Sequence, residues 1–434
     1  MGTTVEYLSK HVIVGAGISG LGVAAAFKRA DIPFDVFEGE QGVGGNWRHG
    51  VYENVHIISS RKTTELTDWP MPTHWPDFPS QAQMLEYLEG YARHHDLYPH
   101  ITFGRRVRSL APTPEGTWVL TFEDGEVRTY GGAVVANGHH WDKRMPTYPG
   151  TFDGVMIHSK DYKSPRSLEG KRVLVIGGGN SACDIAVEAA RFASSAHISM
   201  RRGYWFMPKT LFGIPFVELM KPWMPIPAQR AMIRALLRVA VGPYANYGLP
   251  HPDHRIFERH PTINSELLYY LRHGRITAHP DVARYDGHTA EFVDGSRADF
   301  DLIVCATGYH VSFPFVAPDV VRWGADGMPD LVGGLLPLRH KNIYFFGTGQ
   351  PRYGAGPLIT EGAKALVALI AAQKRMEEPI GAVLHGLGVP SIQSWLLDPH
   401  RVLRESKFVA KFAHRLPDVN RVRRLGAALR AARA

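Results

Sequence analysis

Two glycine-rich turns in this sequence have the residue types and the spacing that bind the pyrophosphate of a dinucleotide. The first is Gly15-Ala16-Gly17-Ile18-Ser19-Gly20, and the second is Gly177-Gly178-Gly179-Asn180-Ser181-Ala182. Glycine lets the backbone approach the phosphates closely, and the N-terminus of the following helix attracts their negative charge. One such turn is a weak signal, but two predict a protein that holds two dinucleotides and passes electrons from one to the other.

The residue at the end of the next expected strand distinguishes the two turns. Glu38 ends that strand after the first turn, and an acid accepts hydrogen bonds from free ribose hydroxyls, as in FAD. Arg201-Arg202 ends the equivalent strand after the second turn, where a pair of arginines binds a ribose 2′-phosphate. The expected cofactors are therefore FAD and NADPH; the alternative for the two arginines is an exposed basic pair.

Each turn must be positioned by a strand before it and by a helix and a second strand after it. Apolar runs bounded by glycine and proline supply these elements. The expected strands are 11–14, 33–37, 133–138, 172–176, 196–200, 302–309 and 343–347, and the expected helices are 21–30, 184–192 and 359–369. The pattern predicts an α/β protein with two Rossmann-like dinucleotide-binding domains. The NADP-binding domain (165–309) is inserted into a discontinuous FAD-binding domain (1–164 and 310–434).

Two segments fit neither sheet. Residues 68–79 are rich in Trp and Pro and predict a rigid loop, after which Ser80 and Gln83 form a capping box for a helix that ends near His95. Residues 206–249 predict a helical insertion, with an apolar helix over 231–241 that acts as a lid or packing helix. These two segments are expected to line the substrate pocket.

The charge of the chain is concentrated near its C-terminus. The net charge is +8, and residues 401–434 alone hold ten Lys and Arg against two acids. The remainder is close to neutral, which argues against a nucleic-acid-binding surface. The basic tail, from about residue 400, is expected to be solvated or to pack against a subunit, with a weak membrane-surface contact as the alternative. No apolar run is long enough for a membrane span and no signal peptide is visible, so a cytoplasmic protein is expected. A homodimer is one alternative for its oligomeric state.

A longer motif lies between the two turns: Phe152-x-Gly154-x-x-x-His158-Ser159-x-x-Tyr162-Lys163. It resembles the fingerprint of the flavin-containing monooxygenases, a class B flavoprotein family. Three further segments are similar to the family's sequences: Gly44-Gly45-Asn46-Trp47, His260-Pro261-Thr262-Ile263-Asn264 and Ala306-Thr307-Gly308-Tyr309. Related Baeyer–Villiger enzymes end the fingerprint with tryptophan, so Tyr162-Lys163 indicates the branch that oxygenates nitrogen and sulfur.

The resemblance implies a cycle in which NADPH reduces FAD. The reduced flavin then captures O2 as a C4a-hydroperoxide, which oxygenates an amine nitrogen or a sulfide sulfur of a small molecule. Such a protein needs no metal, because the cofactor does the chemistry. The expected cofactor-binding residues are Gly15, Gly17, Ser19, Gly20, Glu38, Asn46, Trp47, Ser60, Asn137, Gly177, Gly179, Asn180, Ser181, Ala182, Arg201, Arg202, Thr307 and Gln350.

Two residues are candidates for a catalytic role. His158, in the fingerprint, either links the two domains by hydrogen bonds or transfers a proton. Ser59 aligns with an asparagine that many family members place beside the flavin, and its shorter hydroxyl offers fewer hydrogen bonds. Protection of the oxygenated flavin is then in question, which leaves an uncoupled NADPH oxidase that releases hydrogen peroxide as an alternative. Ketone oxygenation of the Baeyer–Villiger type is a separate alternative. A disulfide reductase is disfavoured because Cys183 and Cys305 form no C-x-x-C motif.

Overall fold

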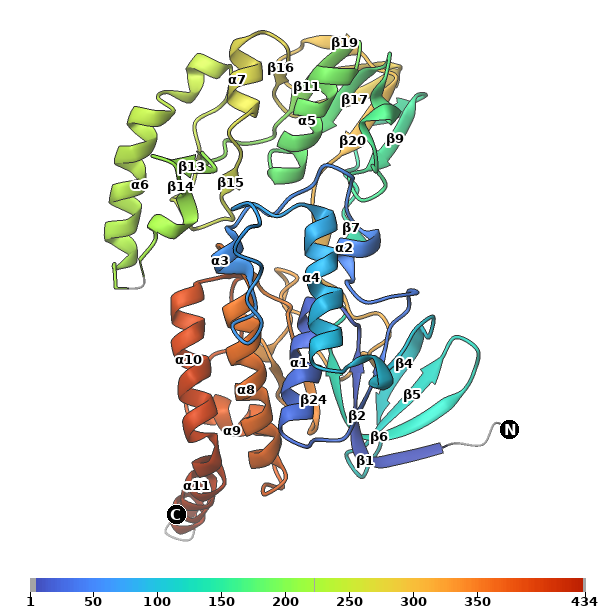
Figure 1. Cartoon of the computed structure of the whole chain (residues 1–434), viewed down its shortest axis with the longest axis vertical. Coiled ribbons are helices and arrows are strands. Elements are labelled where there is room, and N and C mark those ends of the chain that lie inside the picture. Colours follow the sequence, from blue (N-terminus) through green and yellow to red (C-terminus); the bar gives the residue numbers. More distant parts are fainter. Residues whose placement is uncertain (1–4, 222, 432–434) are drawn as a thin grey trace.

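A computed structural model describes residues 5–221 and 223–431. The first of two α/β units is built on a sheet with the strand order β3-β2-β1-β6-β5-β4, in which β24 also pairs with β6 (Figure 1). Strands β1, β2, β3, β6 and β24 run parallel, because apolar runs such as Val12-Ile13-Val14 are buried on both faces. The strands are β1 (Val5–Val14), β2 (Phe34–Phe37), β3 (Ile101–Thr102), β4 (Val107–Pro112), β5 (Trp118–Phe122), β6 (Val127–Val135) and β24 (Ile343–Phe345).

Helices of the first unit bury one face of this sheet. The main ones are α1 (Ile18–Arg29), α4 (Gln81–His94), α8 (Gly356–Gln373) and α9 (Ile380–Gly386). Helix α1 packs closely on α8, since a side chain at Gly22 would lie 2.4 Å from Ile359. The capping box predicted at Ser80 and Gln83 is present and starts α4. The predicted helix 359–369 lies within α8.

The second unit has a sheet of five parallel strands in the order β16-β11-β10-β20-β9. Beside it lies a smaller sheet in the order β19-β18-β17-β8. Their elements are β8 (Gly150–Phe152), β9 (Val155–His158), β10 (Arg172–Ile176), α5 (Asn180–Phe192), β11 (Ser195–Ser199), α7 (Leu267–Arg272), β16 (Thr277–His279), β17 (Val282–Gly287), β18 (Thr289–Phe292), β19 (Arg297–Asp299) and β20 (Leu302–Cys305). The predicted fold class is confirmed. Strand pairing nevertheless places β8 and β9 in the second unit, so the predicted boundary at 164/165 falls too late.

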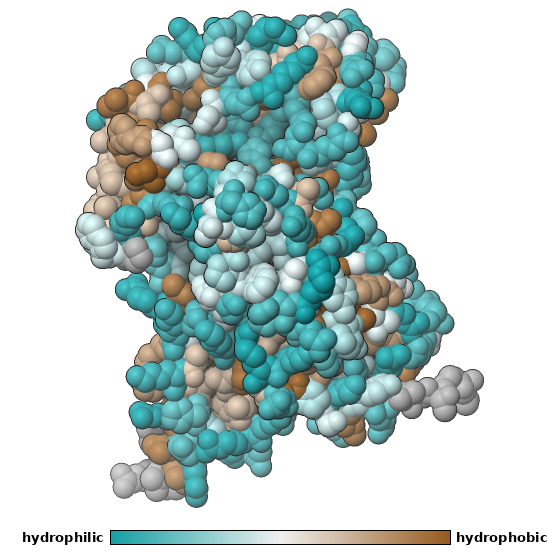
Figure 2. Space-filling model, in the orientation of Figure 1, coloured by the Kyte–Doolittle hydropathy of each residue, from teal (hydrophilic) through white to brown (hydrophobic). Residues whose placement is uncertain are grey.

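The insertion of the second unit is less helical than the sequence predicts. Its helix α6 (Ile226–Ala240) covers the expected apolar segment, but short paired strands precede and follow it. These elements are β12 (Phe206–Met207), β13 (Thr210–Leu211), β14 (Ile214–Pro215), η4 (Tyr244–Tyr247) and β15 (Thr262–Ile263). Figure 2 shows apolar side chains gathered at the molecular edge over this region, where Phe212, Trp223 and Val239 are exposed.

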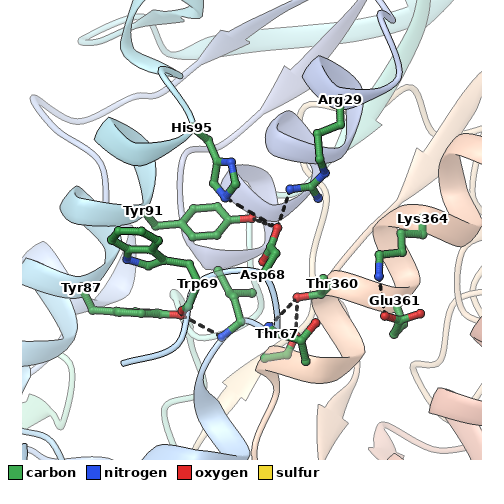
Figure 3. A network of polar contacts seen from close by, with 12 residues as sticks. Arg29, Thr67, Asp68, Trp69, Tyr87, Tyr91, His95, Thr360, Glu361 and Lys364 are labelled. Carbon is green, nitrogen blue, oxygen red and sulfur yellow. Dashed lines mark hydrogen bonds and ion pairs between the residues drawn. The ribbon is translucent and has the colours of Figure 1, made fainter. Parts of the chain in front are cut away.

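The Trp- and Pro-rich loop is held at its start by side chains of α1 and α4 (Figure 3). The carboxylate of Asp68 accepts hydrogen bonds from Arg29 of α1 and, at 3.1 Å, from Tyr91 of α4. The Trp69 ring stacks on His94 at 3.8 Å. These contacts explain why the predicted loop has a fixed path over α4.

The C-terminal region forms two helices, α10 (Pro399–Phe412) and α11 (Leu416–Ala431), of which α10 packs along α8 (Figure 1). Short elements complete the chain: α2 (Asn46–His49), α3 (Arg61–Thr64), β7 (Asp142–Lys143), β21 (Tyr309–His310), β22 (Leu331–Val332), β23 (Leu336–Pro337), β25 (Gln350–Pro351) and β26 (Leu396–Leu397). Among the residues described, no helix combines the length and the apolar character needed to cross a bilayer.

An ion pair fixes the start of two central strands of the second sheet, and its pH dependence is testable. Asp301 accepts the backbone N–H of Arg172 at 2.8 Å and the guanidinium at 2.7 Å, and Arg172 lowers the pKa of Asp301 to about 2. Because the folded pKa is below that of the unfolded chain, the stabilisation is present above about pH 4 and is lost as the pH falls through 2.

We therefore expect Asp301→Asn to lower the melting temperature at pH 7, and to differ progressively less from the wild type below pH 4. Thermal melts over pH 2–7 provide the measurement. Asp299→Asn is the matched control, since Asp299 lies 3.5 Å from the same guanidinium but is more exposed. Equal melting temperatures of wild type and Asp301→Asn at pH 7 would contradict the expectation.

Candidate functional site

The first glycine turn lies between β1 and α1, at the carboxyl edge of the first sheet. Gly15 has φ +106°, and a side chain there would lie 2.6 Å from the Ala136 carbonyl at the end of β6. A side chain at Gly20 would collide with the Gly15 carbonyl at 1.9 Å. Gly17 precedes α1 and has no side chain with which to cap it. The N–H groups of the first helical turn therefore point toward the position of a pyrophosphate.

The second turn repeats this geometry between β10 and α5. Gly177 has φ +135° and lies against the Ala306 carbonyl at the end of β20, where an added side chain would be only 2.3 Å away. Open space lies beside Gly179, the residue that precedes α5. Arg201 and Arg202 follow β11, the neighbouring parallel strand, and so lie at the same edge of the sheet. This is the place where the sequence predicts the 2′-phosphate contact.

Glu38 is oriented toward the first turn. It is 8% exposed, and its two carboxylate oxygens accept the N–H groups of Ala16 at 2.7 Å and Glu40 at 3.0 Å. A carboxylate has further lone pairs, so Glu38 can still accept hydrogen bonds from a ribose. The turn, the uncapped helix and the acid together fit the adenosine diphosphate part of FAD.

Asn46 and Trp47 begin the short helix α2 beside the first turn, after Gly44 and Gly45, which both have positive φ. The side-chain oxygen of Asn46 is buried without a hydrogen-bond partner among the described residues. A buried polar atom of this kind is normally satisfied by a ligand or water. The oxygen lies against Gly50, where an added side chain would be 1.6 Å away, so the role of Asn46 beside the flavin stays a prediction.

The two serines of the predicted flavin side have protein partners. The Ser59 hydroxyl is buried and lies 2.7 Å from the Thr64 hydroxyl. The Ser60 hydroxyl accepts the Thr63 N–H at 3.3 Å and caps α3. Helix α3 in turn packs against the turn before α8, because a side chain at Gly354 would lie 1.9 Å from the Thr63 carbonyl. Both serines thus shape this wall. The Thr64 contact fixes the direction of the Ser59 hydroxyl, which keeps further hydrogen-bonding positions.

His158 ends β9 and both of its ring nitrogens are engaged. Nδ1 accepts the Lys160 N–H at 3.1 Å, so Nε2 carries the proton and donates to the Gly308 carbonyl at 3.0 Å. Burial lowers the pKa of the imidazole, which keeps the ring neutral. The ring ties β9 to the turn after β20, its neighbour in the same sheet. Both nitrogens are thus occupied within the second unit, which argues against proton transfer, and the role of His158 in linking the two domains stays a prediction.

Most of the remaining predicted residues follow strands of the two sheets. Asn137 follows β6 and donates to the Ser312 carbonyl at 3.1 Å, and Thr307 follows β20 and donates to the Arg144 carbonyl. The Ser19 side chain reaches the turn after β24, since a side chain at Gly347 would lie 2.1 Å from its hydroxyl. Gln350 belongs to β25, which pairs with β26.

A buried carboxylate network joins the two units, and the sequence-based prediction missed it. Asp184 of α5 accepts hydrogen bonds from Tyr52 of the first unit and from Asn264, both at 2.9 Å. Burial raises the pKa of Asp184 and also that of Tyr52. One turn further along α5, Glu188 accepts hydrogen bonds from Asn54 at 2.7 Å and from Tyr162 of the fingerprint. The fingerprint tyrosine is therefore a donor to the helix that begins at the second glycine turn.

The spacing of Asp184 and Glu188 in the sequence could have indicated this network. Asp184 and Glu188 are four residues apart in a helix whose other inward residues are Ala, Ile, Val and Cys. Acids at this spacing occupy one face of a helix, and acids in a buried face need donors from elsewhere. The same helix contains Cys183, and burial raises the pKa of its thiol. Burial also raises the pKa of the Cys305 thiol on β20, to about 12. Buried protonated thiols do not suit disulfide exchange.

A family model described as flavin-binding monooxygenase-like matches residues 9–340. The chain belongs to this family. The match contains both turns, Glu38, the fingerprint and the cross-unit network. The expected cofactors, FAD and NADPH, are confirmed at the level of the family, and the close approach at Gly15, the open space at Gly179 and the paired arginines fit them.

Curated flavin-containing monooxygenases are similar to the chain over most of its length. It is 32% identical over 336 residues to flavin-containing monooxygenase 5 of Homo sapiens, which covers 71% of this chain and 63% of that protein. It is 31% identical over 377 residues to dimethylaniline monooxygenase [N-oxide-forming] 2 of Oryctolagus cuniculus, covering 79% of this chain and 69% of that protein. The chain thus spans less than two thirds of the human protein's length.

A cyclohexanone monooxygenase, in its closed crystal structure, has the same fold. The TM-score is 0.73 with 17% sequence identity, over 95% of this chain and 98% of that one. At this identity the likeness shows the two-unit fold of flavin monooxygenases and no more.

The Tyr162–Glu188 hydrogen bond on α5 can be tested for two separate effects, one on stability and one on flavin reduction. We expect Tyr162→Phe to lower the free energy of unfolding by about 1–3 kcal/mol, because Glu188 loses a buried donor. It should also slow reduction of the bound flavin by NADPH, since α5 is no longer held to the fingerprint. Urea unfolding and anaerobic stopped-flow absorbance measure the two effects.

Tyr130→Phe is the matched control. Tyr130 is as buried as Tyr162, and its hydroxyl donates to Asp35 at 3.0 Å, but this pair lies in the first unit, away from α5 and the second glycine turn. A similar loss of stability without a slower flavin reduction is expected for this variant. If the two variants reduce the flavin equally fast, Tyr162 has only a structural role.

Proposed function

We propose that this chain is an NADPH-dependent flavin monooxygenase that oxygenates an amine nitrogen or a sulfide sulfur of a small molecule. One observation carries the proposal: two dinucleotide turns end the parallel sheets of two units, and hydrogen bonds from Tyr52 and Asn54 to α5 link these units in a chain of the flavin-binding monooxygenase family. When bound, the flavin supplies hydride acceptance and oxygen activation. The chain contributes binding, orientation and exclusion of water.

Each unit has a separate binding task. In the first, Gly15–Gly20 hold the FAD pyrophosphate and Glu38 the ribose. In the second, Gly177–Ala182 hold the NADPH pyrophosphate and Arg201 with Arg202 bind the 2′-phosphate. The hydrogen bonds of Asp184 and Glu188 hold the second turn in a fixed place relative to the first unit.

Histidines between the units add no proton donors at neutral pH. His139 lies 3.0 Å from the Gly347 carbonyl, and its ring contacts that of His140 at 4.1 Å. Burial lowers the pKa of both imidazoles and lowers that of His260 to about 4. Neutral buried rings support a site from which water and protons are kept away.

The substrate assignment depends on the fingerprint and on one relative. Tyr162-Lys163 is the ending expected for nitrogen and sulfur oxygenation, and the relative from Oryctolagus cuniculus is named for N-oxide formation. A product panel with tertiary amines, sulfides and cyclic ketones distinguishes the assignment from ketone oxygenation. An ester or lactone as the main product would contradict the assignment and indicate ketone oxygenation instead.

The arginine pair gives the sharpest test of cofactor choice. We expect the double variant Arg201→Ala/Arg202→Ala to raise the KM for NADPH by about 100-fold or more, since two charge-assisted hydrogen bonds are lost. The KM for NADH should change little, because NADH has no 2′-phosphate. Flavin reduction is followed by stopped-flow absorbance with each nucleotide, and Arg166→Ala, on an exposed surface, serves as the control. Equal losses with both nucleotides would assign the arginines a different role.

Ser59 gives a test of coupling between NADPH oxidation and oxygenation. Because its hydroxyl already pairs with Thr64, we expect Ser59→Ala to leave the fraction of NADPH electrons released as hydrogen peroxide unchanged. Ser59→Asn, which adds a donor and an acceptor, should lower that fraction. Peroxide and NADPH consumption are measured together. A rise in peroxide for Ser59→Ala would show that the native hydroxyl does contact the cofactors.

Two partner assignments are part of the proposal. The exposed Arg404, Lys407 and Lys411 of α10 support a weak contact of the C-terminal region with an anionic membrane surface. Sedimentation with vesicles of phosphatidylglycerol and phosphatidylcholine tests this contact. A cytoplasmic location and a homodimer stay predictions.

A further inference from the structure

The insertion of the second unit has a cavity of its own that is open to solvent. Its volume is about 740 Å³, and its walls come from residues 205–258 alone. This volume is in the range of small-molecule sites. The walls include neither glycine turn and neither Arg201 nor Arg202, so the cavity is distinct from the proposed cofactor sites.

One wall is a fixed aromatic corner. The indole N–H of Trp205 donates to the His254 carbonyl at 2.8 Å, and the Tyr244 hydroxyl accepts the Phe206 N–H at 3.1 Å. The Trp205 ring meets the edges of Tyr244 and His251 at 6.2 and 5.7 Å between centroids. Rings held in this way present a preorganised surface for a planar apolar group.

Three arginines and two acids also line the cavity. Arg234 and Arg238 stand one turn apart on the exposed side of α6, and Arg255 also lines the cavity. The ion pairs within residues 5–221 and 223–431 include none from these three arginines. The two acids of the lining are engaged: Asp253 pairs with His254 at 2.9 Å, and Glu258 accepts the Arg255 N–H at 2.8 Å. The guanidinium groups are therefore free to bind an external anion.

We propose that this cavity binds an aromatic organic anion, a planar ring that carries a carboxylate, sulfonate or phosphate. The ring lies in the corner of Trp205, Tyr244 and His251, and the anionic group binds Arg234 and Arg238. Anion binding does not depend on the proposed monooxygenase function, because it is measured without turnover, whereas its coupling to NADP+ rests on the proposed nucleotide site.

The cavity shares a short wall with the nucleotide turn. The ring of Tyr204 covers Gly178, where an added side chain would lie 2.2 Å away, while the next residue, Trp205, faces the cavity. Successive side chains of an extended segment point in opposite directions. Binding of the anion on one side of residues 202–205 is therefore coupled to binding of NADP+ on the other, and the coupling must act equally in both directions.

The test uses the full chain and the fluorescent probe 8-anilinonaphthalene-1-sulfonate. We expect Arg234→Glu/Arg238→Glu to lower the binding affinity for the probe by about tenfold or more, because charge-assisted hydrogen bonds are lost. Lys407→Glu/Lys411→Glu on α10 has the same charge change and spacing and should bind the probe like the wild type. His251→Ala, at an exposed ring, is the second cavity variant if the double variant unfolds.

Competition identifies the source of the anion and can overturn the proposal. Displacement by 1-naphthoate indicates an aromatic carboxylate, and displacement by adenosine 5′-monophosphate indicates a nucleotide. Saturating NADP+ should shift the affinity for the probe without removing it. Equal probe affinity in wild type and both cavity variants, or complete competitive displacement by NADP+, would show that the cavity is not a separate anion site.

Discussion

The structure depends on two close approaches of backbone to backbone. At each glycine turn the chain passes so near the end of the adjacent strand that a side chain would lie 2.6 Å from the Ala136 carbonyl or 2.3 Å from the Ala306 carbonyl. Each approach brings a helix N-terminus to the carboxyl edge of a parallel sheet, where ligands of α/β proteins bind. The sheets, the covering helices and the connections serve to keep these two edges facing a common region.

A second constraint sets the relation of the two edges. Asp184 and Glu188 are carboxylates in the buried face of α5, a position that is unfavourable unless donors are supplied. Donors come from Tyr52 and Asn54 of the first unit and from Tyr162 of the fingerprint. Hydrophobic contacts tolerate sliding, whereas hydrogen bonds to buried acids fix direction and distance. The hydrogen bonds thus offset the free-energy cost of burying the acids, and they also fix the position of the second turn relative to the first.

Sequence reasoning identified what depends on local pattern. Glycine at positive φ, an acid or an arginine pair at a strand end, and the capping box at Ser80 each follow from the chemistry of a few neighbouring residues, and the fold class followed from them. Contacts between distant segments left weaker traces. The donors to α5, the strand pairing of the insertion and the partner of Ser59 require knowledge of which segments meet. The boundary at 164/165 fell too late because β9 is short and its partner, β20, lies far along the chain.

The C-terminal region shows how a segment beyond the family match completes the cofactor side. The match ends at residue 340, but Arg352 lies in the turn before α8 and is only 3% exposed. A buried guanidinium needs a counter-charge, and Asp398 supplies it at 2.5 Å while also accepting the His400 and Arg401 N–H groups that start α10. The Tyr353 hydroxyl contacts His400 on the same helix. Because α3 and its Ser60 cap pack against Gly354 two residues later, the position of α10 bears directly on the wall that contains Ser59. The C-terminal tail stands out in the sequence only by its charge. The first turn of its helix α10 nevertheless supports the wall of the candidate site.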